Sequence, residues 1–83
     1  MIGFYVSAID GKRRAPMLGP FATHAEALGM VDTARHRAYD LDMRSHWWYW
    51  GTCRVETKAE LPKGSMNRYI PIPVINQGQK TLF

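Results

Sequence analysis

Cysteine is nearly absent from this 83-residue sequence, because Cys53 stands alone. One cysteine cannot form an internal disulfide or supply a zinc cluster, so the chain lacks the staples that small secreted domains commonly use. The N-terminus also lacks a basic region followed by an apolar run, and no stretch approaches the length of a bilayer span. We therefore expect a reducing, cytoplasmic location, no targeting segment and no membrane anchor.

Sequence motifs typical of catalytic, phosphate-binding or metal-binding sites are missing as well. The sequence has no glycine-rich phosphate loop, nucleophile elbow or metal-ligand series, and no base lies near Cys53 in sequence to activate its thiol. Asp32, His36 and Asp40 share helical spacing and could hold a divalent ion. Such residues on a solvent-facing helix more commonly form i,i+4 pairs. We expect no enzyme activity, no cofactor and no metal.

The residues that are present indicate one folded, basic domain. Hydrophobic residues make up 46% of the chain and aromatic residues 12%, which is more than disordered chains carry. Eleven Lys and Arg against seven Asp and Glu give a net charge of +4. A basic balance favours partners with acidic surfaces, including nucleic acid and acidic proteins. The excess is too small to choose between them.

The first third of the chain predicts a β-hairpin. Apolar residues alternate over 2–8, which is the period of a half-buried strand. Asp10-Gly11 suits a tight turn, and a second extended run follows over 12–18. Pro16 cannot donate a ladder hydrogen bond, so this second strand should lie at a sheet edge. Gly19-Pro20 then predicts a turn.

A helix is expected next, from about 24 to 41. Thr23 and Glu26 have the spacing of a capping box, in which hydroxyl and carboxylate satisfy amide donors at a helix start. The expected apolar stripe is alanine-rich, which would let the helix sit close to a sheet. Its members are Ala27, Val31, Ala34, Ala38 and Leu41.

The stretch 46–56 holds all three tryptophans and predicts a strand with two aromatic faces. Because side chains alternate across a strand, we assign one set to the core and the other to the surface. The expected core set is Trp47, Tyr49, Cys53 and Val55. The expected exposed set is Trp48, Trp50, Thr52 and Arg54.

Together these elements predict an α+β fold of ββαβ order. We expect a three-stranded antiparallel sheet with the first strand in the centre and one helix packed on one face. Residues 1–60 would form this core domain. Residues 61–83 contain Pro71 and Pro73, and we expect an extended C-terminal segment that forms a peripheral strand or arm.

The exposed tryptophan face is the predicted binding surface. Its residues would be Trp48, Trp50 and Arg54, with Tyr5 in matching register and Arg13 and Arg14 at the hairpin tip. Such a surface could serve as a protein hot spot, or it could stack bases and contact the phosphates of DNA or RNA. A third possibility is that the C-terminal segment folds back and buries this face. The sequence does not specify an oligomeric state.

Two resemblances accompany these patterns. Gly19-Pro20-Phe21 before Thr23 and Glu26 resembles the strand-to-helix corner of peptidoglycan-binding SPOR domains, although the second βα half of that fold is missing. The whole-chain pattern, with Tyr49-Trp50-Gly51-Thr52-Cys53-Arg54-Val55 after the helix, resembles small proteins of bacteriophages and mobile elements. That group includes anti-CRISPR proteins. The resemblance implies a non-enzymatic inhibitor that binds a host protein or nucleoprotein complex, with direct nucleic-acid binding as the alternative.

Overall fold

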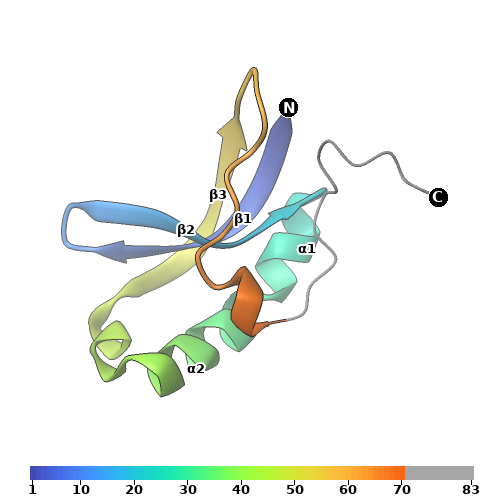
Figure 1. Cartoon of the computed structure of the whole chain (residues 1–83). Helices are drawn as coiled ribbons and strands as arrows, with labels where there is room; N and C mark the ends of the chain where they lie inside the picture. Colours follow the sequence, from blue (N-terminus) through green and yellow to red (C-terminus); the bar gives the residue numbers. More distant parts are fainter. Residues whose placement is uncertain (71–83) are drawn as a thin grey trace.

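The protein has an α+β fold in which helices cover one face of a three-stranded antiparallel sheet (Figure 1). The computed structural model describes residues 1–70. The sheet order is β2-β1-β3, so the predicted ββαβ order with a central first strand is confirmed. The elements are β1 (Ile2–Asp10), β2 (Arg13–Phe21), α1 (His24–Gly29), α2 (Val31–Leu41), the 3-10 helix η1 (Met43–Trp47), β3 (Tyr49–Glu56) and the 3-10 helix η2 (Asn67–Tyr69).

The hairpin forms where it was predicted, but its second strand is longer. Gly11 has a φ of 63° in the turn, and β2 lies at the sheet edge, as the proline indicated. The predicted turn at Gly19-Pro20 is wrong, because β2 continues through it to Phe21. Irregularities in the β1–β2 register absorb the extra residues of β2. As a result Leu18 and Phe21 pair with Val6 and Phe4.

The predicted helix is interrupted at Met30. Its start is confirmed, because Thr23 and Glu26 make both hydrogen bonds of the capping box. Met30 has a φ of −103° and a ψ of 1°, and its N–H donates to the Ala27 carbonyl at 3.1 Å. Gly29, which precedes it, is a poor helix former. The two helices therefore remain consecutive but are not one continuous rod.

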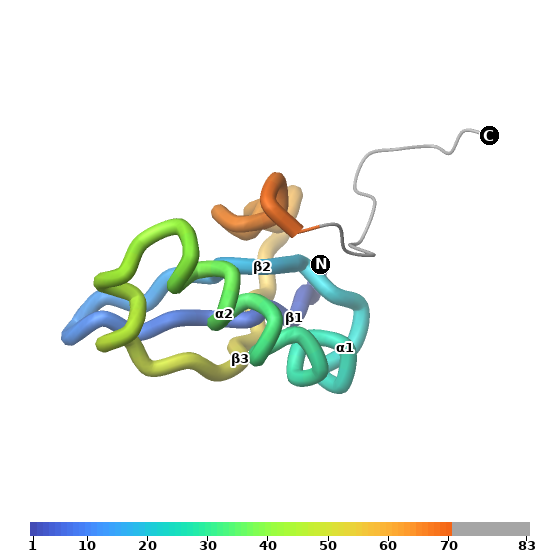
Figure 2. The backbone as a smooth tube through the Cα atoms, turned by 90° about the horizontal axis from the view of Figure 1, so that it is seen from below, coloured from blue at the N-terminus to red at the C-terminus, as the bar shows by residue number. Residues whose placement is uncertain are grey.

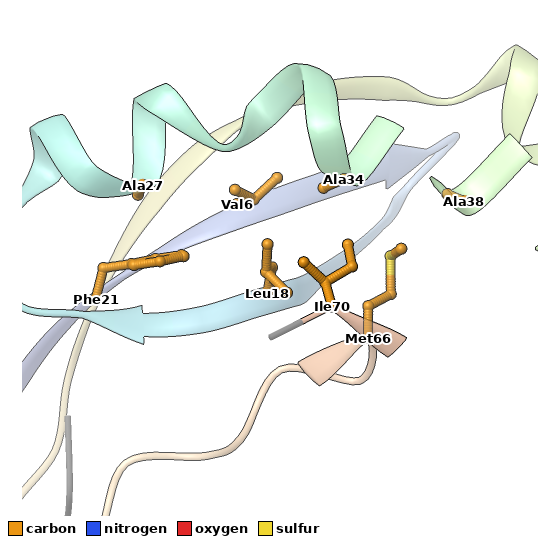
Figure 3. Close-up of a cluster of buried hydrophobic side chains, with 8 residues drawn as sticks. All are labelled: Val6, Leu18, Phe21, Ala27, Ala34, Ala38, Met66 and Ile70. Carbon is orange, nitrogen blue, oxygen red and sulfur yellow. The ribbon is translucent and has the colours of Figure 1, made fainter. Parts of the chain in front are cut away.

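The core lies between these helices and the sheet (Figure 3). Ala27, Ala34 and Ala38 of the predicted stripe are buried, and their small side chains allow the helices to approach the strands closely. Leu41 is exposed, because α2 ends there. The buried cluster consists of Val6, Leu18, Phe21, Ala27, Ala34, Ala38, Met66 and Ile70.

The chain after β3 returns along the outer edge of β2 (Figure 2). The Gly64 N–H donates to the Gly19 carbonyl at 3.1 Å, and the Met66 N–H donates to the Met17 carbonyl at 2.7 Å. Met66 and Ile70 complete the core from this side. Part of the predicted peripheral segment 61–83 is thus buried, at Leu61, Gly64, Met66 and Ile70. Residues 71–83 lie outside the described residues.

The same returning segment covers one end of the sheet face that points away from the helices. Tyr5 lies there with none of its surface exposed, and its hydroxyl donates to the Pro62 carbonyl. Burial raises the pKa of the Tyr5 hydroxyl, and the nearby Cys53 raises it further. The prediction that Tyr5 is a surface contact residue is wrong, because the sequence pattern gave no sign that 61–62 would cross this strand.

Candidate binding surface at the hairpin end

The two faces of β3 are the reverse of those predicted. Trp50 pairs with Ala8 of β1. Ala8 is two residues from the core residue Val6, so both side chains lie on the same face of β1. Trp50 therefore points to the helices, where it is half-buried against the core. Trp47 and Tyr49 are 80% and 77% exposed, so the prediction that they close the core is wrong. Alternation along a strand defines two faces, but the register with β1 decides which one meets the helices.

The face away from the helices is open at its hairpin end. Ile9 pairs with Arg14 on β2 and with Tyr49 on β3, so the three side chains form one row across the sheet. Arg14 and Tyr49 are exposed, and Ile9 is half-buried. A Cβ on the neighbouring Gly51 would meet no atom of residues 1–70 within 4 Å. We call this row, Ile9, Arg14 and Tyr49, together with the exposed Trp47 that precedes β3 in η1, the open sheet end.

Arg13, at the hairpin tip, lies beside Trp48. Arg13 and Trp48 line one pocket of about 320 Å³ together with Arg44 of η1. The structure thus brings together Arg13 and Trp48, two residues of the predicted binding surface, whereas Arg14 lies in the open row with Ile9. Arg44 is also bound to Asp42, with an Nη2–Oδ2 distance of 2.9 Å, and this hydrogen bonding lowers the pKa of the Asp42 carboxyl.

Trp48 also lines a second pocket, of about 540 Å³, between α2 and the start of β3. The rings of Trp48 and Trp50 are tilted by 36°, with their centroids 6.1 Å apart. Two residues of this lining each carry a buried polar atom that has no hydrogen-bond partner within residues 1–70. These atoms are Ser45 Oγ and Trp50 Nε1, each with less than 1 Å² of accessible surface. Each unpaired buried polar group lowers the stability of the fold by about 1–3 kcal/mol, so such groups are rare in folded proteins. The lining residues are Arg35, His36, Tyr39, Asp40, Ser45, His46, Trp48 and Trp50.

Arg54, the remaining predicted contact residue, does not join this surface. It pairs with Phe4, near the far end of β3 from Trp48, and its Nη2 lies 3.4 Å from Glu56 Oε1. Arg54 is exposed, but it belongs to another part of the molecule.

The structure also bears on metal and membrane sites. No group of three or more His, Cys, Asp or Glu side chains in the described part of the chain is placed to hold a metal ion. Asp32 instead accepts a hydrogen bond from Arg35 at 3.1 Å. None of the helices within residues 1–70 has the length and apolar character that a membrane crossing requires.

The sequence interpretation missed Arg44 as a site residue and misplaced Trp47 and Tyr49. One signal could have located η1: Asp42 is an N-cap, and its Oδ1 accepts from the Arg44 N–H at 3.0 Å. A helical turn over 43–47 takes Trp47 out of the strand and ends its alternation. Comparisons of the chain with protein-family models, curated proteins and solved structures found no match.

Proposed function

We propose that this protein is a non-enzymatic binding module that docks onto a partner protein through the open sheet end. The observation that carries the proposal is the exposure of Trp47 and Tyr49, which at 80% and 77% are the two most exposed large hydrophobic side chains of the described residues. Two large aromatic side chains held in water favour association with another surface. Trp, Tyr and Arg are also the residues that dominate protein-binding hot spots.

The charges at this end favour an acidic protein surface over a nucleic-acid backbone. Arg14 stands in the open row, with Lys12 and Arg13 at the adjacent tip. A track for phosphates needs several cations in line, whereas the row itself offers one cation beside an aliphatic and an aromatic side chain. This mixture suits a partner with an apolar pocket bordered by carboxylates.

The resemblance to small phage and mobile-element proteins suggests what kind of protein the partner is. We infer that it is a protein subunit of a host defence nucleoprotein complex, and that the module inhibits the complex in the manner of anti-CRISPR proteins. Occupation of a functional surface is sufficient for inhibition, so no catalytic group is needed. Under this proposal the protein acts in the host cytoplasm, in amounts stoichiometric with its partner.

Capture from host lysate followed by mass spectrometry tests the docking surface. Wild-type protein is compared with the double variant Trp47→Ala/Tyr49→Ala and with Leu28→Ala, a control on α1 whose side chain is 57% exposed. The wild type and the control should capture the same protein, and the double variant should lose it. All three should give the same circular dichroism spectrum, because the changed side chains lie at the surface. Retention by the double variant would show that the open sheet end is not the contact.

Inhibition and salt dependence test the partner class. Added in equimolar amount, the wild type should abolish target cleavage by the purified complex, and the double variant should not. Direct DNA or RNA binding is the competing function. It would produce a gel shift at low salt that weakens steeply with ionic strength and disappears in Arg13→Ala/Arg14→Ala.

A further inference from the structure

β3 is an edge strand, and nothing within residues 1–70 pairs with its outer side. The sheet order is β2-β1-β3, so β1 is the only strand beside it in the described structure. The opposite edge differs, because the returning segment donates hydrogen bonds to β2 from Gly64 and Met66 (Figure 2). An open strand edge offers a row of N–H and C=O groups to another strand.

The pairing with β1 shows which backbone groups of β3 point outward. The Thr57 N–H donates to the Met1 carbonyl at 2.9 Å, and the Met1 nitrogen donates to the Thr57 carbonyl, so these residues form a hydrogen-bonded pair. Such pairs alternate with non-hydrogen-bonded pairs along an antiparallel ladder, and the β1–β3 register is continuous. The N–H and C=O groups of Arg54 and Glu56 therefore point away from β1. No hydrogen bond within residues 1–70 occupies them.

The end of β3 that lies far from the hairpin is the accessible part of this edge. The side chains of Arg54 and Glu56 are 53% and 64% exposed, so the helices do not cover them. Closer to the hairpin, α1 contacts the strand through His24, whose Nε2 lies 3.0 Å from Thr52 Oγ1. An added strand therefore meets fewer obstacles at 54–56 than at Thr52.

The charges at 54–56 select one register for a second, antiparallel copy of β3. Because outward backbone groups must face each other, the two-fold axis passes through a residue of the strand. An axis through Arg54 or Glu56 would set like charges opposite each other. An axis through Thr52 or Cys53 would leave both charges without an oppositely charged residue across the interface. An axis through Val55 sets Arg54 of each copy opposite Glu56 of the other.

We propose that the protein forms a symmetric dimer in which two β3 strands pair about Val55 and join both sheets into one. Each pairing of Arg54 with Glu56 exchanges two backbone hydrogen bonds and adds an ion pair. The contact is smaller than a standard protein interface, so the expected dissociation constant is about 0.1 mM. Tyr49 lies at the other end of β3, so the dimer leaves the open sheet ends of both copies free.

Charge reversal in the full-length protein tests the contact. Sedimentation velocity from about 10 µM to 1 mM should show the wild type passing from monomer to dimer. Arg54→Glu and Glu56→Arg each set like charges across the interface, and each should weaken dimerisation about tenfold or more. Both side chains are more than half exposed, so both variants should keep the wild-type circular dichroism spectrum.

An equimolar mixture of these two variants should recover dimerisation to within about threefold of wild type. One variant is acidic at both positions and the other is basic at both, so their heterodimer regains two attractive pairs. Arg14→Glu is the matched control, because it makes the same charge change at the open sheet end. This control should dimerise like the wild type.

Disulfide trapping tests the register. In a Cys53→Ser background, Val55→Cys places one cysteine of each copy at the axis. Cα atoms of a non-hydrogen-bonded pair lie about 4.5 Å apart, within the range that disulfides span. Mild oxidation should therefore give a covalent dimer. Gly51→Cys in the same background is the control, because it lies off the axis and its Cβ would meet no atom of residues 1–70 within 4 Å.

Three results would overturn the proposal. The first is a protein that stays monomeric up to about 1 mM. The second is a dimer that survives either charge reversal, or that the mixture of variants does not restore. The third is equal cross-linking of Val55→Cys and Gly51→Cys. The dimer does not depend on the proposed function, because Trp47→Ala/Tyr49→Ala should lose the captured partner and still dimerise.

Discussion

Asn67 forms hydrogen bonds with both polar groups of Gly19. The Gly19 N–H donates to Asn67 Oδ1 at 2.9 Å, and Asn67 Nδ2 donates back to the Gly19 carbonyl. That carbonyl also accepts from the Gly64 N–H at 3.1 Å. One side chain thus ties the returning segment to the edge of β2, at a site where Gly19 has a φ of 138° that other residues rarely adopt.

Replacement of this side chain by Asn67→Ala should destabilise the fold by about 1–3 kcal/mol, because the part-buried Gly19 N–H loses its acceptor. For a domain of this size, about 1 kcal/mol lowers the melting temperature by roughly 4–8 °C. Thermal unfolding monitored by circular dichroism measures the change. Asn67→Asp keeps the acceptor for the Gly19 N–H but sets a carboxylate oxygen against the Gly19 carbonyl, so this variant should be destabilised as well. Equal melting temperatures for wild type and Asn67→Ala would show that the segment is not held by this contact.

Gly64 brings the backbone of the returning segment close to β2. A Cβ at this position would lie 2.7 Å from both Leu18 N and Leu18 Cα, so the backbone would have to shift. Gly64→Ala should therefore cost about 1–3 kcal/mol, as overpacking does. Gly29→Ala is the matched control, because its Cβ would meet nothing within 4 Å in the described structure and alanine favours a helix. The control should be neutral or slightly stabilised in the same denaturation experiment.

The features that could be predicted from sequence are those that depend on near neighbours. The turn at Gly11 and the cap formed by Thr23 and Glu26 are determined within four residues, and both are confirmed. The sheet order followed from short connections and from Pro16, which favours an edge strand. Interactions between residues close in sequence were therefore sufficient to predict the fold class.

The candidate site depended on contacts far apart in sequence and was predicted less well. Tyr5 is covered by Pro62, which is 57 residues away, and no local sequence pattern predicts that contact. The two faces of the tryptophan strand were exchanged because only the pairing of Trp50 with Ala8 shows which face meets the helices. Trp48 and Arg13 were both predicted as contact residues, and the structure places them in one pocket.

Alkaline pH should weaken the fold through Tyr5. Its hydroxyl pKa is raised in the folded protein, so folding favours the protonated form. The associated stability is present below the ordinary tyrosine pKa of about 10 and is lost as the pH rises through the folded-state pKa. Melting temperatures between about pH 9 and pH 11.5 should fall more steeply for wild type than for Tyr5→Phe. Parallel curves would contradict this origin of the pH dependence.

Removal of the Ser45 hydroxyl should make the folded protein more stable. Its hydroxyl is buried without a partner in the described structure, so Ser45→Ala removes an unpaired group and only one heavy atom of packing. The variant should be more stable by up to about 1–3 kcal/mol, which thermal unfolding would detect as a higher melting temperature. The exposed Ser65→Ala provides a control that should change little. A variant that is less stable than wild type would mean that the Ser45 hydroxyl already has a hydrogen-bond partner in the folded protein.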